Sequence, residues 1–135
     1  MGRAGVSGYL LDTHALLWAL TDPDRLSPRA LEIIGDTGSA LAVSAASAWE
    51  IATKHRLGRL GQADGLVAAY MKHLSRLGID ELPIAGEHAL LAGGMAWDHR
   101  DPFDRMIAAQ AMIEGFPVVT KDRVLHDLDG IATIW

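Results

Sequence analysis

The chain of 135 residues contains no cysteine. Without cysteine the protein has no disulfide framework, no thiol nucleophile and no zinc site built on thiolates. The sequence is therefore compatible with a reducing compartment, and we expect a cytoplasmic protein.

Long hydrophobic runs are also missing. Charged residues interrupt every apolar segment well before the ~20 residues that a membrane-spanning helix needs, so no transmembrane segment is expected. Residues 1–7 include one arginine but no apolar stretch and no small-residue cleavage site. They predict a short flexible lead rather than a signal peptide.

The remaining composition is that of a globular protein. Hydrophobic residues make up 50% of the chain and charged residues 21%, a balance that argues against disorder. The length favours one domain, residues 1–135. The formal net charge of −5 argues against general binding of polyanions, but it leaves room for a local basic rim or for an acidic pocket filled by metal.

Short apolar runs alternate with longer helical patterns along the sequence. This alternation favours an α/β fold, a three-layer α/β/α sandwich with a mainly parallel central sheet. Pro83 places one expected strand at a sheet edge. The patterns predict strands over 8–12, 40–45, 80–84, 116–120 and 131–135, and helices over 13–20, 27–35, 47–58, 64–77, 86–96, 102–114 and 123–128.

Two aspartates lie at or just after the ends of predicted strands. Asp12 lies at the carboxyl end of the strand predicted over 8–12, and Asp122 comes shortly after the strand predicted over 116–120. Each could simply cap the helix that follows it. However, ligands of open α/β sheets bind at the carboxyl ends of the strands, so both are also candidate site residues.

Glu50 lies three residues after Ser47, which is the spacing of a capping box at a helix start. The sequence therefore predicts that Ser47 and Glu50 cap the helix over 47–58. A glutamate at that place can also point into a cleft at the sheet edge, and Glu50 stays a candidate for function.

The stretch HRDPFDRMIAAQAM (99–112) contains two aspartates at the start of one helix. Asp101 before Pro102 is a good N-cap, because proline has no amide hydrogen to leave unpaired. Asp104 shares its helical face with Ile107, Ala108 and Ala111, a stripe that should pack on the sheet. A carboxylate on a packing stripe is costly unless something compensates it.

A divalent cation would compensate clustered acids. If Asp12, Glu50, Asp104 and Asp122 converge, each raises the pKa of its neighbours, and a bound cation keeps them ionised. Oxygen ligands without cysteine or paired histidines suit Mg²⁺ or Mn²⁺. Such pockets often cleave phosphodiesters, because the metal neutralises phosphate and activates water.

Four segments resemble the PIN-domain family, and more narrowly the VapC-type toxins of bacterial toxin–antitoxin pairs. They occur in the family's order and span nearly the whole chain. The segments are LLDTHALLW (10–18), SAWEIATKHRLGRL (47–60), HRDPFDRMIAAQA (99–111) and VVTKD (118–122).

The resemblance implies a metal-dependent endoribonuclease whose acid cluster consists of Asp12, Glu50, Asp104 and Asp122. We expect Asp12, Asp104 and Asp122 to bind the metal, with Glu50 orienting water or a second ion. Thr120 matches the family's serine or threonine beside the fourth acid. His14 stands where many relatives have asparagine or serine, which leaves its role open.

The resemblance also implies partners. Such proteins form homodimers and bind an antitoxin in a groove near the active site. No helix-turn-helix is apparent in this sequence, so contact with operator DNA is expected only through the antitoxin. The RNA itself, transfer or ribosomal, is not specified by these residues.

Basic residues follow or flank the candidate acids and could form a rim for RNA phosphates. They could equally be ordinary solvated helix faces. The six histidines show no metal-binding pair at helical spacing and are expected to be structural or surface residues. The predicted rim consists of Lys54, Arg56, Arg59, Arg100, Arg105, Lys121 and Arg123.

Three other classes stay open. A receiver-type phosphoacceptor domain needs an aspartate after a central strand, and ALAVSA (40–45) ends without one. A haloacid dehalogenase-type phosphatase needs a second aspartate two residues after the first, where this chain has His14. A non-catalytic PIN-like module that binds RNA or protein is the third alternative.

Overall fold

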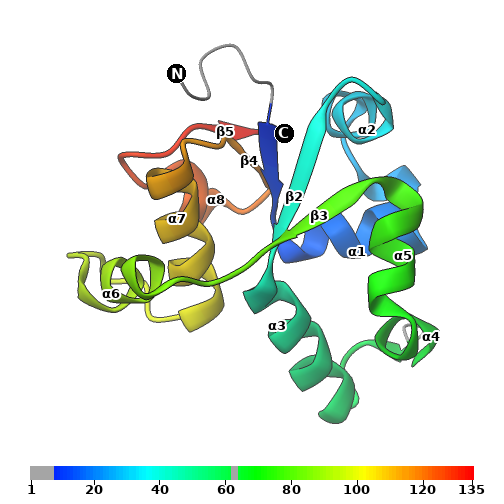
Figure 1. Ribbon diagram of the computed structural model, residues 1–135, viewed down its shortest axis with the longest axis horizontal. Helices are drawn as coiled ribbons and strands as arrows, with labels where there is room; N and C mark the ends of the chain where they lie inside the picture. The colour runs from blue at the N-terminus through cyan, green and yellow to red at the C-terminus, as the bar shows by residue number, and fades with distance from the viewer. Residues whose placement is uncertain (1–7, 62–63) are drawn as a thin grey trace.

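The computed structural model describes residues 8–61 and 64–135 (Figure 1). The predicted flexible lead, residues 1–7, lies outside the described residues. None of the described helices is both long enough and apolar enough to cross a membrane.

The centre of the fold is a five-stranded sheet in the order β3-β2-β1-β4-β5, and all of its strand pairs are parallel. The predicted α/β class and parallel sheet are confirmed. β3 is an edge strand, as predicted, but it ends at Leu82, so Pro83 lies directly after the strand and not within it. The strands are β1 (Gly8–Leu11), β2 (Ala40–Ser44), β3 (Ile79–Leu82), β4 (Val118–Val119) and β5 (Thr133–Ile134).

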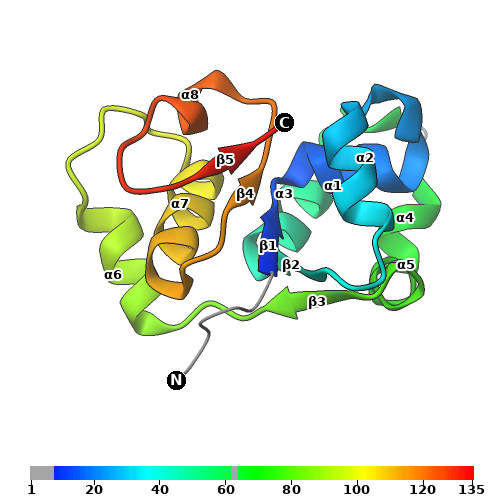
Figure 2. The same ribbon diagram turned by 90° about the horizontal axis from the view of Figure 1, so that it is seen from above.

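Helices cover both faces of this sheet, which gives the predicted three layers (Figure 2). Neighbouring residues of β1 point to opposite faces, so Leu11 belongs to one hydrophobic cluster and Leu10 to the other. The helices on the Leu11 face are α1 (Thr13–Thr21), α2 (Pro28–Gly35), α4 (Asp64–Ala68) and α5 (Tyr70–Leu77). Those on the Leu10 face are α6 (Gly86–Gly94), α7 (Pro102–Glu114) and α8 (Arg123–His126).

One predicted helix is split in two, and one short helix was not predicted. The helix predicted over 64–77 is two helices, because the backbone of Ala69 (φ −125°, ψ 31°) leaves the helical region between α4 and α5. Met71, two residues after Ala69, has 57% of its surface exposed. A short 3₁₀ helix, η1 (Pro23–Arg25), follows α1 and was not predicted.

The strand order places a crevice beside β1. After β1 the chain adds β2 and β3 on one side of it, and later adds β4 and β5 on the other. β1 and β4 are therefore neighbours whose connections leave in different directions, which is the switch point where parallel sheets bind ligands. Asp12 follows β1 at this point, and Thr120 follows β4.

Candidate active site

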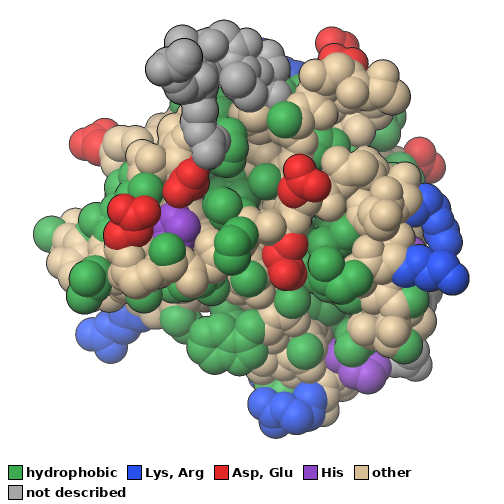
Figure 3. Space-filling model, in the orientation of Figure 1, with side chains coloured by type: hydrophobic (Ala, Val, Ile, Leu, Met, Phe, Trp, Pro, Cys, Tyr) green, Lys and Arg blue, Asp and Glu red, His purple; other side chains and the backbone are tan. Residues whose placement is uncertain are grey.

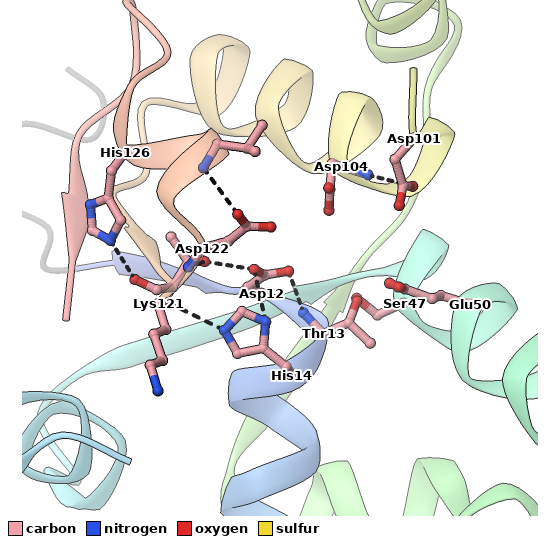
Figure 4. A network of polar contacts seen from close by, with 12 residues as sticks. Asp12, Thr13, His14, Ser47, Glu50, Asp101, Asp104, Lys121, Asp122 and His126 are labelled. Carbon is pink, nitrogen blue, oxygen red and sulfur yellow. Dashed lines mark hydrogen bonds and ion pairs between the residues drawn. The ribbon is translucent and has the colours of Figure 1, made fainter. Parts of the chain in front are cut away.

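An acidic pocket of about 180 Å³ opens at the carboxyl ends of β1 and β4. In Figure 4 the carboxylates of Asp12, Asp104 and Asp122 point toward one another across it. The pocket thus brings together all four acids predicted from the sequence, which lie on four separate segments. Its lining residues are Asp12, Thr13, His14, Leu17, Glu50, Lys54, Asp101, Asp104 and Asp122.

Asp12 is the most buried acid of the pocket, with 3% of its surface exposed. One carboxylate oxygen, Oδ1, accepts a hydrogen bond of 2.7 Å from the backbone of Thr13 and so caps α1. The other, Oδ2, accepts 2.6 Å from the Thr120 hydroxyl and lies 3.2 Å from Nδ1 of His14. Asp12 therefore both caps a helix and lines the pocket, and its position is fixed on several sides.

The loop after β4 is connected to Asp12 through two contacts. The backbone N–H of Asp122 donates to the Thr120 hydroxyl at 3.0 Å, and that hydroxyl donates to Asp12. The backbone N–H of Lys121 donates to Nε2 of His14 at 3.2 Å. Because Nε2 accepts this bond, the neutral ring carries its hydrogen on Nδ1, which faces Asp12. His14 thus bridges the two strand ends.

Glu50 reaches the pocket from α3 (Ala45–Arg56), but the predicted capping box is wrong. α3 begins two residues earlier than predicted, and its N-cap is Ser44, whose hydroxyl accepts from the N–H of Ala46. Ser47 lies inside the helix, where its hydroxyl is 2.8 Å from that of Thr13. Local spacing misplaced the helix start because Ser44 and Ser47 are both able to cap.

Glu50 is therefore free of a capping role. Its Oε2 accepts from Nζ of Lys54 at 2.8 Å, and 7% of the Glu50 surface is exposed. Its Oε1 is buried and has no hydrogen-bond partner in the described structure. Buried polar atoms are nearly always paired, so this unpaired carboxylate oxygen at the pocket is available to a ligand or a water.

The two aspartates at the start of α7 lie where the sequence predicted, one at the N-cap and one on the packing stripe. Asp101 is the N-cap, and its Oδ1 accepts from the N–H groups of Phe103 and Asp104. Asp104 lies on the stripe whose further members, Ile107 and Ala108, are fully buried. Its Oδ2 is 2.6 Å from Nε2 of His99.

Burial raises the pKa values of two of these acids. For Asp104, loss of hydration raises the pKa to about 6, the bond to His99 opposes the rise, and the charges of Asp101, Asp12 and Asp122 add to it. For Asp12, loss of hydration also raises the pKa, while His14 and Thr120 oppose the rise. Without a cation, the pocket therefore disfavours the ionised forms of these two acids, which a cation would favour.

Stability should depend on pH through Asp104. Its folded pKa of about 6 exceeds the ordinary 3.8, so between these values the folded chain holds the proton more tightly than the unfolded chain. The contribution of Asp104 to the free energy of unfolding is greatest below pH ~4 and is lost as the pH rises through ~6. Without divalent cations, the Asp104→Asn protein should gain stability relative to the wild type over this range. Urea unfolding of both proteins at several pH values measures the difference, and a constant difference would contradict the assignment.

The residues available to a metal are mainly oxygen donors. At this pocket, among the described residues, His99, Asp101 and Asp104 offer ligand atoms within 4.8 Å of one another. Asp12, Glu50 and Asp122 lie outside that close group although they line the same pocket. This spacing fits a cation that retains several waters and takes one or two carboxylates directly, as Mg²⁺ does.

Arg105 and Lys54, two members of the predicted basic rim, have partners within the protein. Arg105 does not belong to it, because its guanidinium donates to the carbonyls of Ala92, Met95, Trp97 and His99 at 2.6–2.9 Å. Lys54 is paired with Glu50. The other predicted members, Arg56, Arg59, Arg100, Lys121 and Arg123, are exposed. On the face in Figure 3, Lys and Arg side chains lie apart around the periphery rather than in one basic area.

Two histidines contact acids of the site, although the sequence left the role of His14 open and predicted the other histidines as structural or surface residues. His14 contacts Asp12, and His99 contacts Asp104. Helical spacing was the wrong criterion, because each histidine bonds a carboxylate rather than a second histidine. The sequence signal for these contacts was proximity: His14 lies two residues after Asp12, and His99 lies five residues before Asp104.

The fold and the site together define a parallel α/β domain with an acidic pocket at the switch point of its sheet. The sequence model of the PIN domain matches residues 9–131. The chain therefore belongs to the PIN domain family, and the receiver and dehalogenase alternatives are excluded. A curated relative, Ribonuclease VapC22 of Mycobacterium tuberculosis, is 33% identical over 131 residues, which are 93% of this chain and 97% of the relative.

Solved structures share the fold. The DNA-bound VapBC from Salmonella typhimurium contains a chain that matches with a TM-score of 0.68 at 20% identity, over 96% of this chain and 97% of that one. A chain of VapBC2 from Rickettsia felis, bound to a promoter DNA fragment, matches with a TM-score of 0.65 at 14% identity, over 94% and 97% of the two chains.

Proposed function

We propose that this protein is a metal-dependent endoribonuclease and the toxin of a toxin–antitoxin pair. The carrying observation is that Asp12, Glu50, Asp104 and Asp122 line one pocket, in which a buried oxygen of Glu50 has no partner. Membership of the PIN domain family and the similarity to a ribonuclease support this proposal.

The residues present fit Mg²⁺ or Mn²⁺. The donors are carboxylates, and burial raises the pKa of Asp12 and Asp104 where no cation compensates their charge. Asp12, Asp104 and Asp122 would hold the ion, directly or through its waters, and the ion when bound neutralises phosphate charge and lowers the pKa of water. Glu50 orients the attacking water through its unpaired oxygen. Thr120 and His14 hold the carboxylate of Asp12, while His99 holds that of Asp104.

We further infer that the protein acts in the cytoplasm, as a homodimer held inactive by a cognate antitoxin. The DNA-bound VapBC and VapBC2 structures, which contain chains of the same fold, support the association with an antitoxin. DNA contact would then come through the antitoxin.

Cleavage of RNA with mapped ends tests the proposal. Purified protein should cut an RNA at defined positions when Mg²⁺ is present, and EDTA should stop the reaction. Asp12→Asn protein should not cut, because the substitution removes a carboxylate charge from the most buried position of the pocket. Uncut RNA in Mg²⁺ and in Mn²⁺ would favour the non-catalytic alternative, a module that only binds RNA or protein.

A further inference from the structure

A second pocket, of about 640 Å³, adjoins the acidic one. Its volume lies within the range of small-ligand sites. Leu17 of α1 lines both pockets, so the two are neighbours along this helix. The side chains used below are Leu17, Trp18, Thr21, Arg25, Arg59 and Leu60.

The second pocket carries the opposite charge. Arg25 of η1 and Arg59 after α3 both line it and are exposed. Asp22 contributes one carboxylate to the lining. Among the side chains that the structure describes, no carboxylate forms an ion pair with either arginine. Two positively charged guanidinium groups next to the acidic pocket can bind a phosphate, which the carboxylates alone repel.

An aromatic ring lies beside these cations. The Cζ atom of Arg25 is 4.5 Å from the centroid of the Trp18 ring, a cation–π distance that holds the guanidinium at the pocket. Nζ of Lys121 is 5.8 Å from the same centroid, and Trp135 packs against the ring at 5.8 Å between centroids. Trp18 is thereby fixed in place, and Leu17 and Leu60 supply apolar surface next to it.

We propose that this pocket is a nucleotide subsite for single-stranded RNA. Arg25 and Arg59 bind the phosphate of a nucleotide next to the one that is cut, and the base stacks on the Trp18–Arg25 pair. Aromatic and arginine surfaces with neighbouring cations are how single strands are bound without reading their sequence. The inference rests on the proposed ribonuclease function and adds Arg25, which the predicted rim did not include.

The position along α1 supports this order of subsites. Trp18 lies six residues after Asp12, which corresponds to about 9 Å along a helix axis. Neighbouring nucleotides of one strand bridge such a separation. A strand whose scissile phosphate is at the acids can therefore place an adjacent nucleotide in the second pocket.

Binding of a short fluorescein-labelled RNA, measured by anisotropy in EDTA, tests the subsite. The background is Asp104→Asn, which removes a repelling carboxylate and prevents cleavage. Adding Arg25→Gln and Arg59→Gln should weaken binding about tenfold at low salt and lower the slope of log affinity against log salt by about 0.7, since both arginines bind one phosphate and each neutralised phosphate on a single strand contributes about 0.7. Arg29→Gln with Arg76→Gln, two exposed arginines outside the pocket, is the charge-matched control and should change both quantities less.

A double substitution to lysine distinguishes the effect of lost charge from the effect of a disturbed fold. Arg25→Lys with Arg59→Lys should recover most of the salt slope, and thermal unfolding shows whether each variant is folded. RNA containing 4-thiouridine should cross-link within residues 17–25 or 59–60. Equal losses in the two glutamine pairs would overturn the subsite, because the effect would then come from net charge alone.

If the Arg25 and Arg59 substitutions do not change the affinity for RNA, the subsite proposal is also overturned. The pocket would then be a binding site for a protein partner. Failure of the ribonuclease proposal has a different signature, because it appears as absence of Mg²⁺-dependent cleavage by the wild-type chain. Binding in EDTA is measured independently of that reaction.

Discussion

Replacing Asp104 by asparagine should abolish RNA cleavage while leaving the protein folded. The substitution removes the charge of a carboxylate that faces Asp12 and Asp122 across the pocket. Loss of an outer partner of a metal ligand typically costs ten- to hundredfold in activity, so loss of a ligand should cost at least about a hundredfold. The N-cap of α7 is Asp101, not Asp104, and the helix should therefore persist.

Cleavage rates and the far-ultraviolet circular dichroism of the same preparations measure this result. Asp129→Asn is the matched control, because Asp129 is exposed and lies outside the pocket lining. It should cleave like the wild type. Retained activity in Asp104→Asn would remove Asp104 from the metal site and leave it as a partner of His99 only.

Substitution of Arg105, the residue after Asp104, should instead lower the stability of the fold. Arg105→Ala should lower the free energy of unfolding by about 3 kcal/mol, since hydrogen bonds from charged donors each contribute about 1.5–3 kcal/mol and are not additive. The guanidinium donates to four carbonyls at the end of α6 and in the loop before α7. Its removal leaves those carbonyls without their donor and frees the segment that carries His99. Thermal unfolding should show a midpoint lower by about 10 °C.

Arg105→Lys should recover only part of this stability, because an ammonium has three donors and lacks the planar fork of arginine. Arg100→Ala is the control within the same segment. Arg100 is exposed, and a surface substitution of this kind typically changes stability by no more than about 0.5 kcal/mol. A loss as small as the Arg100 control's would show that Arg105 is not a structural clamp.

The elements with strong local signals were predictable from the sequence. Asp101 before Pro102 fixed the start of α7, and Gly115 fixed its end because its φ of 75° suits glycine. The alternation of apolar runs predicted the parallel sheet. Weak signals failed where two local solutions compete, as for Ser44 and Ser47 at the start of α3.

The site divides in the same way. The sequence by itself determined which acids are candidates, because strand ends and a charged residue on a packing stripe are local features. Only the tertiary structure decided that Asp12, Glu50, Asp104 and Asp122 share one pocket, since the strand order β3-β2-β1-β4-β5 sets which strand ends are neighbours. It also decided that Arg105 serves the fold and that His14 and His99 serve the acids. Local spacing put His14 and His99 near these acids in the sequence, but which backbone carbonyl or carboxylate a side chain meets depends on packing between elements.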